Sequence, residues 1–342
     1  MPSEEYVDAI ARELSIRSLG EPPVGVDTIY LGGGTPSRLG PAAVARLLDV
    51  ISHRFPPAPD AEITIEVNPD DVSPSAVAEW RAAGVNRVSL GVQSFDDQAL
   101  AWMHRTHDST RVTQAVATLR DGGMTNWSLD LIFALPAELG RDWAGDVERA
   151  VALEPPHISL YGLTVESHTP IAHWRDRGAT VEAGEDEYEN EYLHADQALR
   201  TSGYVHYEVS NFGRTGHASR HNRGYWNGAS YVGLGPAAHG YDGNARRWNE
   251  REYTSWLARV NAGTDPVAGV EDLTAENRVA EEVYLGLRTL DGLRVNRSEW
   301  DMIRPWVEAQ WASLESDLLR LTPTGWLRLD SLASSLTMLR SR

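Results

Sequence analysis

Short runs rich in β-branched and aromatic residues alternate with helical stretches along the first two-thirds of the chain. Most of these runs are followed by Gly, Asn, Pro or Ser, which commonly end strands. Repeated units of strand and helix predict an α/β fold with a parallel sheet, open or closed into a barrel. The expected strands are Asp27–Leu31, Glu62–Val67, Arg87–Val92, Trp127–Phe133, His157–Tyr161 and Tyr204–Val209.

The helical stretches carry recognisable start and stop signals. In the segment Ser73–Ala83, Ser73 suits the N-cap, Pro74 suits the first turn and Gly84 suits the stop. The N-terminal twenty residues predict an amphipathic helix capped at Ser3. They contain no apolar core of the kind found in a signal peptide.

The pattern changes after about residue 210. Residues 210–245 are rich in Gly, Asn, His and aromatic residues, and they predict an ordered loop region. The remainder is mainly helical, with its strongest helix over Leu273–Leu290 and a small hairpin over Leu319–Leu329. We therefore expect a barrel over residues 1–245 and a small, mainly helical, winged-helix-like domain over residues 246–342.

Composition narrows the function classes. The 342 residues carry 31 basic and 49 acidic side chains, and a formal net charge of −18 disfavours nucleic acid as a partner. Every basic residue is arginine, so lysine Schiff-base chemistry is excluded. No cysteine is present, which removes thiol nucleophiles, disulfides and thiolate metal sites. No apolar run reaches membrane-spanning length, so we expect a cytoplasmic protein for which peripheral membrane contact stays open.

Polar residues follow four of the expected strands, at the edge where sites form in such folds. A glycine run after the first strand offers backbone N–H groups to an anionic ligand, although a tight turn explains it equally well. Asp130 lies inside an apolar strand, where an acid is costly unless it is paired or bound. The set suits a ligand with amino-acid and nucleoside parts, and it consists of Gly33, Gly34, Thr35, Glu66, Gln93, Arg105 and Asp130.

A second cluster combines histidines and aromatic residues in the sequence HNRGYW and beyond. His221 and His239 are candidates for binding a haem iron or a planar ligand, and a loop packed by aromatic residues is the more common alternative. The pair Gly233 and Gly235 lacks the third glycine of a nucleotide-binding fingerprint. The acidic run Glu182–Glu191 predicts a solvated helix face.

Eight ordered motifs bring the chain close to a known family. They are GGGTPS, EVNP, GVQSF, DLIFALP, HISLYGLTVESHTP, YEVSNF, HNRGYW and GLGPAAHG. In this order they resemble radical S-adenosylmethionine (SAM) proteins of the HemN/HemW type, which comprise haem chaperones and oxygen-independent coproporphyrinogen III oxidases. The resemblance runs from about residue 6 to the C-terminus. It implies a partial (β/α) TIM-like barrel with a C-terminal accessory module.

The resemblance also implies roles for individual residues. Gly33, Gly34 and Thr35 would meet the methionine end of SAM. The rest of SAM would be held by Glu66, Gln93, Arg105 and Asp130. The element HNRGYW resembles the haem-chaperone branch more than the oxidase, which makes His221 the candidate haem ligand.

The chain departs from the family at one place. The family carries Cys-x-x-x-Cys-x-x-Cys after a first barrel strand, ahead of the helix expected here from residue 3, and this chain has no cysteine. Three thiolates are needed for the [4Fe–4S] cluster that cleaves SAM, so radical chemistry is not expected of the chain as given. We favour a start assigned too far downstream over a natural cluster-free remnant, because the SAM-binding residues are intact. The missing strand would leave Asp27–Leu31 with an unpaired edge and make the chain less stable than an extended version.

Three functions remain as hypotheses. The first is a haem chaperone that binds haem and SAM, holds a cluster only if an upstream segment exists, and passes haem to acceptor proteins. The second is an oxygen-independent coproporphyrinogen III oxidase, which decarboxylates propionates by radical chemistry. The third is a cluster-free binding protein derived from the same family.

Overall fold

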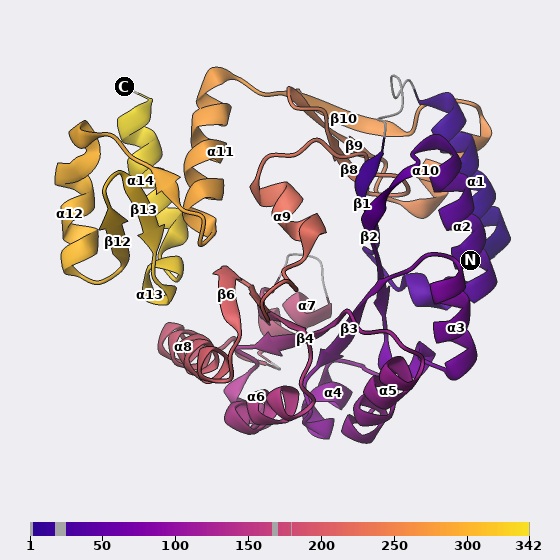
Figure 1. Cartoon of the computed structure of the whole chain (residues 1–342), viewed down its shortest axis with the longest axis horizontal. Helices are drawn as coiled ribbons and strands as arrows, with labels where there is room; N and C mark the ends of the chain where they lie inside the picture. The colour runs from indigo at the N-terminus through magenta and orange to yellow at the C-terminus, as the bar shows by residue number, and fades with distance from the viewer. Residues whose placement is uncertain (1–2, 18–24, 166–169, 179, 342) are drawn as a thin grey trace.

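The computed structural model describes residues 3–17, 25–165, 170–178 and 180–341. A curled sheet forms its larger part, with helices along the outer side (Figure 1). The strands are β1 (Val26–Leu31), β2 (Pro57–Val67), β3 (Arg87–Gln93), β4 (Trp127–Phe133), β5 (His157–Gly162), β6 (Val205–Glu208) and β7 (Asn211–Gly213). The helices of this part are α1 (Ser3–Ile16), α2 (Pro41–Arg54), α3 (Pro74–Ala82), α4 (Asp97–Trp102), α5 (Ser109–Asp121), α6 (Trp143–Ala152), α7 (Pro170–Asp176) and α8 (Glu185–Thr201).

The strand order is β1-β2-β3-β4-β5-β7-β6. Strands β1 to β5 pair in parallel, as the alternation of strands and helices predicts. Strand β7 is antiparallel to both β5 and β6, which was not predicted, because its three residues are too few to show a period. Within the described residues β1 and β6 are edge strands, so the sheet is a partial barrel, and β1 has the free edge expected of it.

The predicted α3 helix shows how local signals set its ends. The Ser73 hydroxyl accepts a hydrogen bond from the Ala76 amide at 3.2 Å, which satisfies one of the free amides at the helix start. Gly84 follows the helix with a φ of +97°, a conformation that suits glycine. Both signals therefore act as predicted from the sequence.

The strands β1 to β5 alternate between an apolar outer face and a polar inner face. Outward side chains such as Ile65, Leu90, Leu129 and Ile158 are completely buried beneath the helices. Inward positions lie in register across neighbouring strands, and they include Thr28, Tyr30, Glu62, Thr64, Glu66, Arg87, Ser89, Ser128, Asp130, His157, Ser159 and Tyr161. A closed barrel of this type is filled by branched apolar residues. Here the interior is polar, which suits a polar ligand.

The region expected to be a loop between residues 210 and 245 contains regular structure. Besides β7, it holds the helix α9 (Arg220–Trp226), which lies inside the curl of the sheet (Figure 1). The Ser219 hydroxyl caps α9 by accepting from the Asn222 amide at 3.2 Å. The loop prediction was wrong here, because a helix of seven residues is too short to display a 3.6-residue period.

A second sheet was also not predicted. Strands β8 (His239–Tyr241), β9 (Ala245–Asn249) and β10 (Val267–Asp272) form an antiparallel sheet in the order β10-β9-β8. The chain beyond residue 250 is mainly helical as expected, and β10 is a strand within it that the sequence did not predict. The sequence ARRWN of β9 lacks the alternation of apolar and polar residues that marks a strand.

The C-terminal residues form a separate small unit, seen at one end of the molecule in Figure 1. Its elements are α11 (Ala275–Arg288), β11 (Leu293–Arg294), α12 (Trp300–Glu308), β12 (Ala312–Glu315), β13 (Leu318–Leu321), α13 (Pro323–Trp326) and α14 (Leu329–Arg340). The predicted helix over Leu273–Leu290 is confirmed as α11. The hairpin lies over β12 and β13, upstream of the predicted Leu319–Leu329, because Thr322 caps α13 there instead.

Two hydrophobic clusters mark the division of the chain. Trp256 and Val260, on α10 (Tyr253–Asn261), belong to the core of the curled sheet, whereas a second core begins at Val283. A boundary at residue 245 stays a prediction, and the packing favours a later one, between Val260 and Val283. Among the described residues no helix is long and apolar enough to cross a membrane.

The acidic run on α8 is mostly the solvated face predicted for it. Glu191 is the exception, because its carboxylate accepts from the Ala134 amide at 2.6 Å and from the Arg141 guanidinium at 2.7 Å. These bonds tie α8 to the end of β4. Residues 166–169, near the end of the motif HISLYGLTVESHTP that begins in β5, lie outside the described residues.

Candidate functional site

A cavity of about 350 Å³ opens at the carboxyl ends of β1 to β5. Its walls come from the inner face of the sheet and from the loops that follow the strands. It is lined by Tyr30, Gly34, Thr35, Glu66, Val67, Asn68, Ser89, Gly91, Gln93, Arg105, Asp130, Ile132 and Tyr161. All the residues predicted to hold SAM line this cavity except Gly33, whose amide bonds to one of them.

Two glycines of the run after β1 are favoured by local structure, Gly32 by close packing and Gly33 by its backbone conformation. A Cβ at Gly32 would lie 2.3 Å from the Tyr30 ring and 2.6 Å from Glu66 Oε1, so a side chain does not fit there. Gly33 has a φ of +86°, and its amide donates to Glu66 Oε2 at 3.1 Å. These observations support the tight-turn explanation of the run, and the binding-site explanation stays a prediction.

Glu66 is fixed from both sides. The Tyr30 hydroxyl donates to Glu66 Oε1 at 2.7 Å, while the Gly33 amide holds Oε2. Burial raises the pKa of the Glu66 carboxyl, and the Tyr30 hydrogen bond opposes that rise. Each carboxylate oxygen keeps a further lone pair, so Glu66 can accept hydrogen bonds from hydroxyl or ammonium groups in the cavity.

Asp130 is satisfied by hydroxyl groups from its own strand and from the neighbouring strand β3. Ser89 donates to Asp130 Oδ2 at 2.7 Å, and the Ser128 hydroxyl lies 3.4 Å from Oδ1. Burial raises the pKa of Asp130, and the Ser89 hydrogen bond lowers it in part. The cost of an acid in this strand is therefore offset within the protein, while Asp130 still faces the cavity.

Gln93 and Arg105 also line the cavity. Gln93 has a φ of +70° where the pairing of β3 with β4 shifts register, and such strained positions cluster at functional sites. The Arg105 guanidinium donates to Asn68 Oδ1 at 3.3 Å, and burial lowers the pKa of Arg105. No carboxylate pairs with Arg105 among the described residues, so its charge is available to an anionic group in the cavity.

Four lining residues with polar side chains were not identified from the sequence as site residues: Tyr30, Asn68, Ser89 and Tyr161. Three of them are inward-facing strand positions on the same face of the sheet as Glu66 and Asp130. The period-two alternation of each strand, applied to those two acids, is the signal that would have found them. Asn68 stands within the motif EVNP, but no separate reason marked it.

His221 lies beside this cavity, on the other side of Tyr30. Its ring stacks on the Tyr30 ring with centroids 4.6 Å apart and an interplanar angle of 16°. Nδ1 lies 2.9 Å from the Thr28 hydroxyl, and Nε2 lies 2.9 Å from the Tyr225 hydroxyl. Burial lowers the pKa of His221 to about 4, so its imidazole is neutral at ordinary pH.

His239 has different surroundings. It begins β8, its side chain is exposed, and its ring stacks on Trp248 of β9 at a centroid distance of 6.1 Å. The haem-ligand role of either histidine stays a prediction. Of the two, only His221 shares a contact with a residue that lines the cavity.

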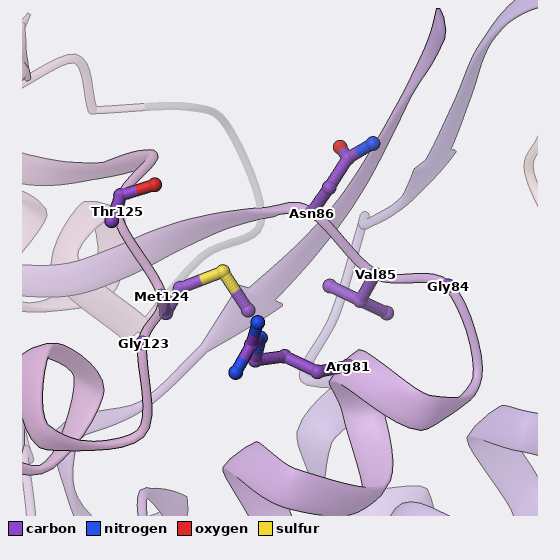
Figure 2. A pocket seen from close by; sticks show the side chains of 7 residues that line it. All are labelled: Arg81, Gly84, Val85, Asn86, Gly123, Met124 and Thr125. Carbon is purple, nitrogen blue, oxygen red and sulfur yellow. The ribbon is translucent and has the colours of Figure 1, made fainter. Parts of the chain in front are cut away.

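A second cavity, of about 300 Å³, lies at the opposite, amino ends of β3 and β4 (Figure 2). The Arg81 guanidinium at its centre donates to the Gly122 carbonyl at 2.7 Å. The Asn86 side chain donates to the Ala61 carbonyl and accepts from the Ile63 amide. These hydrogen bonds hold the surrounding loops together, which gives Arg81 and Asn86 a structural role.

The donor set for a metal cluster is absent from this chain. The sequence contains no cysteine, and the described residues hold no group of three or more His, Cys, Asp or Glu placed for a metal ion. The residues present therefore do not fit a [4Fe–4S] cluster.

Comparison with known proteins identifies the family. A model of the radical SAM superfamily matches residues 3–150, which include every residue of the cavity except Tyr161. The haem chaperone HemW of Mycobacterium tuberculosis is 36% identical over 336 residues, covering 97% of this chain and 86% of that protein. The chain belongs to the HemW family of radical SAM proteins. The family predicted from the eight motifs is thereby confirmed.

Other HemW proteins show the same relationship. HemW of Synechocystis is 37% identical over 84% of this chain and 70% of its own length. HemW of Escherichia coli is 35% identical over 70% of this chain and 62% of its own length. The structure of coproporphyrinogen III oxidase (HemN) from Escherichia coli superimposes with a TM-score of 0.81, at 21% identity, over 98% of this chain and 83% of that one. That similarity confirms the partial-barrel fold.

Proposed function

We propose that this chain is a cytoplasmic haem chaperone that binds SAM in the cavity at the strand ends and haem through His221. The observation that carries the proposal is the position of HNRGYW. It folds as α9 inside the curl of the sheet and brings a neutral histidine against the wall of the cofactor cavity. The HemW relatives support the chaperone function, and haem-acceptor proteins are its proposed partners.

The cavity matches the chemistry of SAM. Arg105 offers a cation for the carboxylate, and the backbone amides of Gly34 and Thr35 offer further donors. Glu66 and Asp130 offer acceptors for ribose hydroxyls and the ammonium group, and Gln93 offers both kinds of group. Because this chain supplies no thiolate, we assign SAM a binding role and derive no radical step from it.

His221 has the surroundings of a histidine ligand. Ligating histidines commonly donate their second ring N–H to an oxygen acceptor, and the Thr28 hydroxyl is placed to accept from Nδ1. In that tautomer Nε2 carries the lone pair, and the Tyr225 hydroxyl must leave it before iron can bind. Tyr225 lies one turn along α9 and its ring packs edge-on against the imidazole, so His221 and Tyr225 must move apart before the nitrogen is free.

Titration of hemin with Soret detection tests the proposal. We expect His221→Ala to weaken hemin binding by at least about tenfold, because the iron loses its side-chain ligand. His239→Ala tests the second histidine, and His53→Ala on the exposed face of α2 is the matched control. Unchanged hemin affinity in His221→Ala would remove His221 from the proposal.

The oxidase hypothesis has less support. The HemN structure shares the fold at low sequence identity, and the named relatives over most of the chain are HemW proteins. Oxidative decarboxylation also needs a cluster that the residues of this chain do not hold. We therefore retain the chaperone as the proposed function.

A further inference from the structure

One side chain belongs to both proposed binding sites. Tyr30 lines the SAM cavity, and the opposite side of the same residue packs against His221. Its hydroxyl donates to Glu66 at 2.7 Å, while its ring lies nearly parallel to the imidazole at 4.6 Å. The two sites are thus separated by the thickness of one ring.

On the cavity side, Tyr30 fixes the orientation of Glu66. The carboxylate is held at Oε1 by the Tyr30 hydroxyl and at Oε2 by the Gly33 amide. Gly32 leaves no room for Glu66 to move toward β1, since the gap there is too small for a single Cβ. Loss of the Tyr30 hydrogen bond would release one of the two anchors that hold Glu66 ready for a ligand.

On the α9 side, His221 fixes the ring of Tyr30. Both imidazole nitrogens are already hydrogen-bonded, to Thr28 and to Tyr225, and one flat face lies on Tyr30. A ligand therefore cannot reach a ring nitrogen unless His221 gives up a bond and shifts within this packed arrangement. That shift uncovers the Tyr30 ring, whose position sets where its hydroxyl points.

We propose that Tyr30 couples the two sites negatively, so that each of SAM and haem weakens the binding of the other. The inference rests on the proposed function and adds a regulatory contact to it. SAM bound to Glu66 favours the observed arrangement, in which Tyr30 contacts both Glu66 and His221 and both imidazole nitrogens are hydrogen-bonded. Haem bound to His221 favours the alternative arrangement, in which His221 has shifted away from Tyr30. By linkage, the two effects must be equal in size.

Binding constants measured with and without the second ligand test the coupling. We expect saturating SAM to weaken hemin affinity by roughly five- to tenfold, and hemin to weaken SAM affinity in calorimetry by the same factor. Tyr30→Phe keeps the ring but removes the hydroxyl. Each ligand should therefore still bind, and the factor by which one ligand weakens the other should fall to about one. Tyr241→Phe is the matched control, because that hydroxyl donates to the Gly243 carbonyl away from both sites, and the factor should persist.

The outcomes separate the coupling from the function on which it rests. If the wild-type chain binds neither ligand, the proposed function fails and the coupling fails with it. If it binds both independently, or if each strengthens the other, only the coupling is overturned. A factor that survives in Tyr30→Phe would overturn the role of Tyr30. Tyr30→Leu, which removes ring and hydroxyl together, is the second variant should Tyr30→Phe fold poorly.

Discussion

Glu13 and Trp256, which are 243 positions apart in the sequence, meet in a 2.9 Å hydrogen bond from the indole nitrogen to Glu13 Oε2. Both side chains are completely buried. The same carboxylate accepts from the Arg17 guanidinium at 2.9 Å, the Gly235 amide at 2.9 Å and the Asn249 side chain at 2.8 Å. One buried acid thereby ties α1 to β9, to α10 and to the loop GLGPAAHG.

We expect Glu13→Gln to lower the free energy of unfolding by about 3–5 kcal/mol, because it leaves the buried Arg17 without its counter-charge. The midpoint of urea unfolding measures the change. Glu4→Gln on the same helix is the control, since Glu4 pairs with Arg46 at the surface and should contribute less than about 1 kcal/mol. Equal effects of the two substitutions would show that the buried network is not the source of the stability.

The same network explains what the sequence could not show about Gly233 and Gly235. The Gly233 carbonyl accepts from Arg17 at 2.5 Å, and a Cβ at Gly233 would lie 1.9 Å from the His239 carbonyl oxygen. Gly235 has a φ of +99° and donates its amide to Glu13. Gly233 serves close packing against the His239 backbone, and the amide of Gly235 reaches an acid more than two hundred residues away in the sequence. Local sequence patterns hold no trace of such a contact.

We expect Glu66→Gln to weaken SAM binding by roughly 10- to 100-fold, because hydrogen bonds to a charged acceptor contribute about 1.5–3 kcal/mol. The amide retains an acceptor for Tyr30, so the fold should be preserved. Isothermal titration with SAM gives the constant. Glu79→Gln, on the exposed face of α3, is the control and should leave it unchanged. Wild-type affinity in Glu66→Gln would contradict the placement of SAM beside Glu66.

The strand ends predicted which side chains line one cavity, because parallel strands carry their carboxyl ends to a common edge. Glu66, Gln93 and Asp130 come from three neighbouring strands, so one topological rule brings them together. No such rule predicts where α9 lies. His221 reaches Thr28 across 193 positions of sequence, and only the tertiary fold decides which strand it packs against. The antiparallel sheet β10-β9-β8 was missed for the related reason that its short strands show no alternation.

Hemin affinity should be nearly independent of pH even in the range where an ordinary histidine becomes protonated and stops binding iron. Burial lowers the pKa of His221 to about 4, so protons compete with iron only near that pH. Between about pH 8 and about pH 5.5 we expect a change of less than about twofold, whereas an imidazole with an ordinary pKa of about 6.5 would lose about tenfold. Soret titrations across this range, with His221→Ala as the baseline, measure the difference. A loss centred near pH 6.5 would show that haem uses a different, exposed histidine.

Gln310 ends α12 in a conformation that suits glycine. It follows Ala309, the C-cap of that helix, with a φ of +60°, and its side chain is exposed. Its amide donates to the Val307 carbonyl at 3.1 Å and its carbonyl accepts from Thr322 at 2.8 Å, and glycine keeps both bonds. We expect Gln310→Gly to raise the free energy of unfolding by about 1 kcal/mol, because the left-handed conformation is costly for residues with a Cβ.

The matched control for that change is the same substitution inside a helix. Gln197 is exposed on α8, and Gln197→Gly should lower the free energy of unfolding by about 1 kcal/mol, because glycine is a poor helix former. Urea midpoints at unchanged slope compare the two variants. The two changes in unfolding free energy should have opposite signs, because Gln310 has a left-handed backbone conformation and Gln197 has a helical one. If both variants were destabilised equally, the left-handed position of Gln310 would carry no strain, and its side chain would have to stabilise α12 by another contact.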